Sequence, residues 1–139
     1  MTERNVEIIR RAMEAWNRGD IEASLELADP EIEWTAIGAM PDATETYHGH
    51  EGVREFFRTF MDAWEHVSLV AEEFIESGDV VVALGHFHAK GRNSGLEIDG
   101  PFGQVLTMRR GRVVRLRGYP DHAQALKAAG LRGSARKLS

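Results

Sequence analysis

Hydrophobic and polar residues alternate most clearly between residues 101 and 119, which predicts a β-hairpin with its turn at Gly111. One face of its first strand carries Phe102, Gln104, Leu106 and Met108. Gln104 is the one polar side chain on this otherwise apolar face. Because a buried amide without partners costs about 1–3 kcal/mol, Gln104 is a candidate functional residue.

Three other stretches repeat apolar residues every three or four positions, as amphipathic helices do. The predicted helices cover residues 3–18, a short segment capped by Asp20, and a segment that follows Gly49 and continues to Trp64. A fourth, closing helix is predicted after Asp121, which can cap it. The helices therefore lie mostly in the first half of the chain.

The remaining apolar runs predict strands that follow one another in hairpins. These strands cover residues 31–35, 67–74 and 80–90, and loops are expected at 36–46 and 91–100. This order predicts one α+β domain over residues 1–139, in which a curved antiparallel sheet wraps around the N-terminal helices. Such a cone leaves an internal pocket, and residues 131–139 are expected to form a flexible tail.

Composition narrows the function classes. The chain has 139 residues, a formal net charge of −5 and no cysteine, so disulfides and a cysteine nucleophile are excluded. The chain is acidic and no basic face stands out except at residues 109–117, so nucleic-acid binding has little support. No apolar run approaches the length of a membrane span and no signal-peptide pattern is present, so we expect a cytoplasmic protein that does not bind membranes. No cofactor is expected.

Two histidines are the sharpest candidates for chemistry. His86 and His88 lie two positions apart on a predicted strand, on the same face as Val82 and Leu84. We expect this face to line the pocket, with His86 as a general acid or base and Gln104 as the group that polarises a ligand oxygen. The alternative is a pair of structural histidines. A metal bound to them would need a third ligand, such as His48, and is not expected.

A second set of residues is expected to bind a small hydrophobic ligand. Aromatic residues lie on both sides of the loop at 36–46 and along one face of the third helix, where they could form an apolar wall for a ligand. The alternative is that these residues belong to an ordinary hydrophobic core. The expected ligand-binding residues are Trp34, Tyr47, His48, Phe56, Phe60, His88, Met108 and Gly118.

Three separated strings resemble the SnoaL-like branch of the nuclear transport factor 2-like superfamily. They are AWNRGDIEASLELADPEIEW, YHGHEGVREFF and GPFGQVLTMRRGRVVRLRGYPDHAQALKAAGL, in that order. The resemblance implies a cone-shaped pocket and a homodimer formed through the outer face of the sheet. It also implies that the residues used by ketosteroid isomerases are largely replaced, with Trp34 in place of the aspartate base and Gln104 in place of an aspartate oxyanion donor.

Two functions follow from the sequence as expectations. The first is an enzyme of isomerase, cyclase or hydrolase type that transfers a proton on a small hydrophobic molecule. The second is a non-catalytic module of the same fold that binds a ligand or another protein.

Overall fold

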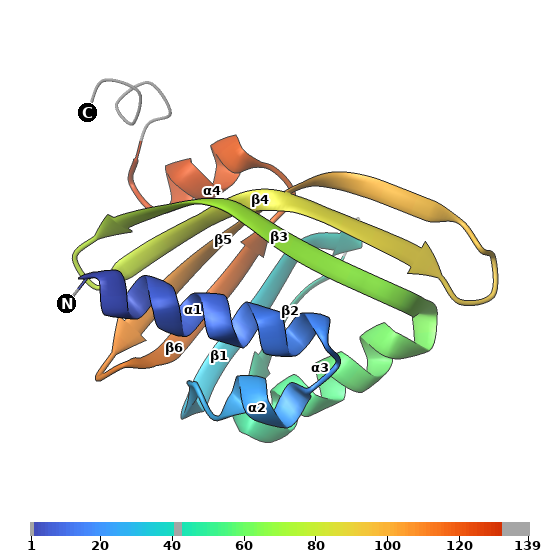
Figure 1. Ribbon diagram of the computed structural model, residues 1–139, viewed down its shortest axis with the longest axis horizontal. Coiled ribbons are helices and arrows are strands. Elements are labelled where there is room, and N and C mark those ends of the chain that lie inside the picture. Colours follow the sequence, from blue (N-terminus) through green and yellow to red (C-terminus); the bar gives the residue numbers. More distant parts are fainter. Residues whose placement is uncertain (1, 41–42, 132–139) are drawn as a thin grey trace.

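The computed structural model describes the backbone of residues 2–40 and 43–131, and the side chains of residues 5–35 and 46–131. The helices are α1 (Thr2–Asn17), α2 (Ile21–Leu25), α3 (Gly49–Ala63) and α4 (His122–Ala128). The strands are β1 (Ala28–Met40), β2 (Ala43–His48), β3 (Trp64–Ser77), β4 (Val80–Gly91), β5 (Glu97–Arg109) and β6 (Arg112–Tyr119) (Figure 1). The tail expected at 131–139 lies, apart from Leu131, outside the described residues.

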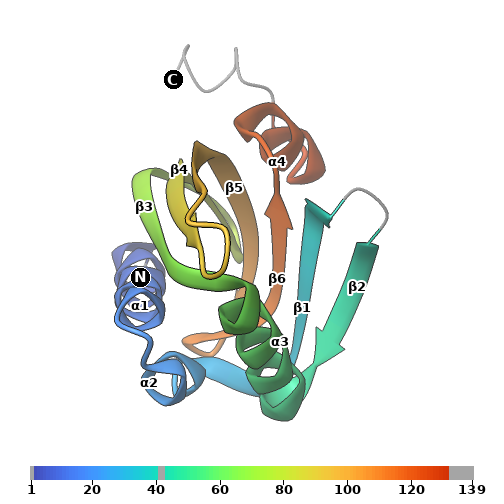
Figure 2. The same ribbon diagram turned by 90° about the vertical axis from the view of Figure 1, so that its right-hand side faces the viewer.

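The strands form one curved sheet in the order β2-β1-β6-β5-β4-β3, which does not close into a barrel (Figure 2). This confirms the expected α+β class. One pair departs from the antiparallel pattern, because β1 and β6 run parallel. These two strands are far apart in the sequence, so no hairpin turn forces them to be antiparallel.

The two faces of the sheet are covered by different helices (Figure 2). On the concave face, Val81, Ala83 and Leu106 pack with Ile8 and Ile9 of α1 in the larger core cluster. On the outer face, a second cluster joins α4 to the sheet, and it consists of Val82, Leu84, Ala125 and Leu126. One end of β4 is therefore buried on both sides, which explains its unbroken apolar run.

Several predicted boundaries differ from the structure. The expected loop at 91–100 is shorter, because β5 begins at Glu97. The expected loop at 36–46 falls largely within β1 and β2, because these strands extend to Met40 and from Ala43. Trp64 begins β3, although its spacing suited the preceding helix. The predicted caps are confirmed: Asp20 accepts a hydrogen bond from the amide of Ala23, and Asp121 accepts one from that of Gln124.

Close contact between α4 and β5 gives a stability prediction. A Cβ atom added at Gly103 would lie 2.5 Å from the Cβ atom of Ala125, so Gly103→Ala must push α4 away from the sheet. We expect this variant to lower the free energy of unfolding by about 1–3 kcal/mol in urea denaturation. Gly118→Ala is the matched control, because its nearest neighbour would be 4.0 Å away and its effect should stay below about 1 kcal/mol. Equal effects of the two substitutions would contradict the packing argument.

Candidate functional site

A cavity of about 490 Å³, here called the main cavity, lies on the concave side of the sheet. Its walls come from α1, α3 and all strands except β2, as far as the described residues show. Described lining residues are Trp16, Trp34, Thr35, Phe56, Phe60, Trp64, Val67, Leu69, Phe87, Ala89, Ile98, Gly100, Pro101, Phe102, Gly103, Gln104, Leu116, Gly118, Tyr119 and Pro120. The volume is within the range of small-molecule sites.

Aromatic side chains dominate the helical side of the main cavity. The rings of Trp16 and Trp34 stack with their centroids 5.5 Å apart, and Phe56 and Phe60 stack at 5.4 Å. Trp16 also contacts Phe57 edge-on at 5.0 Å. These contacts hold each ring in a defined orientation, so the wall is largely formed before a ligand arrives.

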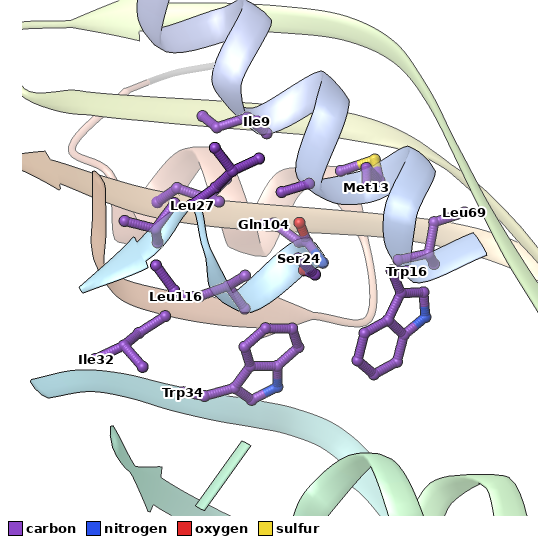
Figure 3. A pocket seen from close by; sticks show the side chains of 14 residues that line it. Ile9, Met13, Trp16, Ser24, Leu27, Ile32, Trp34, Leu69, Gln104 and Leu116 are labelled. Atoms are coloured by element: carbon purple, nitrogen blue, oxygen red, sulfur yellow. The ribbon is translucent and has the colours of Figure 1, made fainter. Parts of the chain in front are cut away.

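A second, smaller space of about 40 Å³ lies between α1, α2 and the sheet, and we call it the inner chamber. Figure 3 shows Gln104 among its lining side chains, with Trp34 below it and Met13 above it. The two spaces share the lining residues Trp16, Trp34, Leu69, Gln104 and Leu116. Gln104 therefore lies at the boundary between them.

Gln104 is 9% exposed, and no described residue forms a hydrogen bond with its side-chain amide. Its neighbours across the sheet are Gly118 on β6 and Ala83 on β4, two of the smallest residues. The other buried polar residue, Thr35, differs because its hydroxyl lies 2.8 Å from that of Thr46. Gln104 thus presents a free donor and a free acceptor to the space beside it.

Hydrogen bonds to backbone groups hold two walls of the main cavity in place. The Asn17 amide at the end of α1 both donates to the carbonyl of Leu69 and accepts from its N–H group, at 2.8 and 2.9 Å. The Arg92 guanidinium, in the turn between β4 and β5, donates to the carbonyls of Met61 and Trp64 at the end of α3. These bonds tie α1 to β3, and α3 to the β4–β5 hairpin.

The expectation that His86 and His88 face the pocket is wrong. His86 is on the outer face of the sheet with 58% of its side chain exposed, and its Nδ1 atom lies 2.7 Å from the carboxylate of Glu72. The concave face of β4 instead contributes Phe87 and Ala89 to the main cavity. The error came from Val82 and Leu84, which are buried because α4 covers them from outside.

His88 belongs to a charged cluster on this outer face. Its Nδ1 atom lies 2.6 Å from Asp99 and its Nε2 atom 3.1 Å from Glu97. The hydrogen bond to Asp99 is the main cause that raises the pKa of His88 above its ordinary value, because it favours the charged imidazolium. Within the described residues, no group of three or more histidine, aspartate and glutamate side chains is arranged to hold a metal ion.

The other predicted ligand-binding residues divide into two groups. Trp34, Phe56, Phe60 and Gly118 line the main cavity together with Gln104.

Tyr47, His48 and Met108 are not among the described lining residues of either space. The ring centroids of Tyr47 and Phe56 lie 5.2 Å apart. His48 is exposed at the start of α3, and Met108 is buried in the larger core cluster. Ligand binding by any of these residues remains a prediction.

Several lining residues were missed by sequence reasoning. Trp16 and Trp64 were placed on the apolar faces of helices without a binding role, and Phe87 lies on the strand face opposite to the one that was expected to line the pocket. Phe87 and Ala89 lie two positions apart, which indicates that both face the same side of the sheet. The continuous apolar run before them made it impossible to tell from the sequence which of the two faces is concave.

Solved structures with the same fold support the family assignment. A nuclear transport factor 2-like protein of unknown function from Burkholderia pseudomallei is 29% identical with a TM-score of 0.78, and the match covers 89% of this chain and 95% of that one. TerC, co-crystallised with polyporic acid, is also 29% identical at a TM-score of 0.78, with 85% and 92% covered.

A protein of ketosteroid isomerase-like fold from Catenulispora acidiphila, in complex with trimethylamine, is similar in fold. It is 17% identical, has a TM-score of 0.74, and the match covers 90% of this chain and 93% of that one. None of the curated proteins matches this chain. Among the described residues, no helix is long and apolar enough to cross a membrane.

The family model for the SnoaL-like domain matches residues 9–116, which span α1 to most of β6 and include both Trp16 and Gln104. Together with the α+β cone, this match confirms the resemblance seen in the three sequence strings. The chain belongs to the SnoaL-like domain family, within the nuclear transport factor 2-like fold.

Proposed function

We propose that this protein binds a small, mainly apolar organic molecule in the main cavity. The observation that carries the proposal is an aromatic cavity of about 490 Å³ in which one buried amide, that of Gln104, has no hydrogen-bond partner among the described residues. Aromatic walls supply contact area for flat or ring-containing molecules, and the amide supplies a fixed polar contact.

The similarity to TerC supports this proposal in general terms. That protein was co-crystallised with polyporic acid, so a chain of this fold with 29% identity holds an organic molecule. We take from this comparison the capacity of the fold to bind such a molecule, and not the identity of the compound.

Proton-transfer catalysis by His86 does not suit the geometry, since His86 lies on the other side of the sheet. The described lining of the main cavity contains no carboxylate, imidazole or amine that could act as a base there. Binding is therefore the function that we propose for the cavity, with Gln104 as the group that hydrogen-bonds to the ligand.

We also propose that the protein is cytoplasmic, as expected from its sequence.

The first prediction tests whether a ligand occupies the main cavity. All three tryptophans of the chain line it, so their fluorescence reports on binding of a probe such as 2-naphthol. In Gly118→Leu the new side chain has open space beside Gln104, and it should weaken 2-naphthol binding at least about tenfold by filling that space.

His86→Ala is the control for this experiment, because it changes the outer face and should leave binding unchanged. Ala89→Phe adds a ring to the β4 part of the cavity wall and should act like Gly118→Leu. Thermal unfolding of each variant shows that it is folded. If Gly118→Leu and Ala89→Phe bind 2-naphthol as tightly as the original chain, the ligand is not in the main cavity.

We further propose that the protein is a homodimer formed through the outer face of β3, β4 and β5. This part of the face is not covered by α4 and presents Val70 with 58% exposure. Around Val70, carboxylates alternate with histidines across the strands, as in the pairs Glu72–His86 and Asp99–His88. A second copy turned by a two-fold rotation would bring the same face of both chains together and cover Val70.

Analytical ultracentrifugation at micromolar concentration tests the dimer. We expect twice the mass of one chain, and we expect Val70→Arg to give the single-chain mass because a charge is placed within an apolar contact. Leu96→Arg is the matched control, since Leu96 is 62% exposed in the turn between β4 and β5, away from the proposed contact. A single-chain mass for the unaltered protein would refute the proposal.

A further inference from the structure

We infer that the main cavity selects uncharged ligands, and that the preferred ligand carries one hydrogen-bonding group, such as a hydroxyl or carbonyl, which binds Gln104. This inference rests on the proposed binding function and names the chemical class of ligand. It is argued from the charge, the free hydrogen-bonding groups and the shape of the cavity.

The first step is the charge of the lining. Of the twenty described residues around the main cavity, none is an aspartate, glutamate, lysine, arginine or histidine. Tyr119 has an ionisable phenol, but its side chain packs with the α4 cluster on the outer face. Among the described lining residues, an ion that enters this space finds no partner of opposite charge to replace its water. Burial of such an ion is strongly unfavourable.

The second step is the position of the free amide. Gln104 lies between Gly118 and Ala83 on the neighbouring strands, so no large side chain screens its amide from the sides. The amide can donate to a ligand oxygen and accept from a ligand hydroxyl, whereas a salt bridge is beyond its chemistry. The Gln104 amide therefore favours a ligand with a neutral polar group at this point of the cavity.

The third step concerns the space behind Gln104. The inner chamber measures about 40 Å³ and its other described lining residues are apolar apart from Ser24. This volume suits a few waters or a small substituent, and it is too small for an aromatic ring. The rings of a ligand must therefore remain in the main cavity, with its polar group directed inward toward Gln104.

Aromatic walls can also attract cations through their ring faces, which makes an ammonium ligand the main competitor. Trp16 and Trp34 stack on each other at 5.5 Å, and Phe56 and Phe60 at 5.4 Å, so each of these rings gives one face to its neighbour. The described lining contains no carboxylate that would add to the attraction of the remaining ring faces for a cation, so a neutral ligand is favoured.

The experiment compares three probes with the same ring system and different charge at pH 7. These are 2-naphthol, which is neutral, 2-naphthoate, which is an anion, and 2-naphthylmethylammonium, which is a cation. Titration calorimetry on the full chain should show 2-naphthol binding at least about tenfold more tightly than either ion. If either ion binds as tightly as 2-naphthol, the charge selection is refuted.

The role of Gln104 is tested with Gln104→Leu, which keeps the approximate shape and removes the polar atoms. We expect the variant to bind 2-naphthol about five- to tenfold more weakly and to bind naphthalene, which has no hydroxyl, as well as the original chain does. Equal losses for both probes would show that Gln104 only supports the cavity wall. If no naphthyl probe binds the original chain, the proposed binding function itself fails, and this outcome is distinct from binding without charge selection.

Discussion

The packing of α4 against the outer face of β4 and β5 determines which side chains reach the main cavity. Val82 and Leu84 point outward because Ala125 and Leu126 of α4 bury them there. Since side chains alternate along a strand, this contact directs Phe87 and Ala89 to the concave face and His86 to the outer face. A small helix at the end of the chain thereby decides the chemistry of a cavity on the opposite side of the sheet.

The sheet separates the ionisable side chains on its outer face from the mainly apolar lining of the main cavity. Histidines and carboxylates are paired on the outer face, and there the hydrogen bond to Asp99 raises the pKa of His88. Inside, the described lining has Gln104 as a polar side chain without a hydrogen-bond partner among the described residues, so its amide is available to a ligand or water in the cavity. A polar group without a partner in an otherwise apolar wall indicates binding, and Gln104 is therefore a stronger candidate than any histidine.

The sequence predicted the helices, most strands, the α+β class and the position of Gln104, because these depend on local periodicity and on caps such as Asp121. It failed for the face of β4, where an apolar run that is buried on both sides contains no information about direction. Spacing identified the aromatic residues but not their roles. Trp16 was given only a place on the apolar face of a helix and lines the main cavity, whereas Met108 was assigned to the pocket and lies in the core. Periodicity identifies a buried face, and only the three-dimensional arrangement shows where that face meets empty space.

A hollow of this size must also be kept open. Apolar walls tend to collapse onto one another, because each unfilled volume forfeits contacts that a close-packed interior would make. In this protein the walls are fixed by directional bonds to the backbone, from Asn17 to Leu69 and from Arg92 to the end of α3. Such bonds cannot shorten to let the aromatic residues close the space. The main cavity is thus stabilised by polar contacts at its edges, which leaves its interior free to be apolar and uncharged.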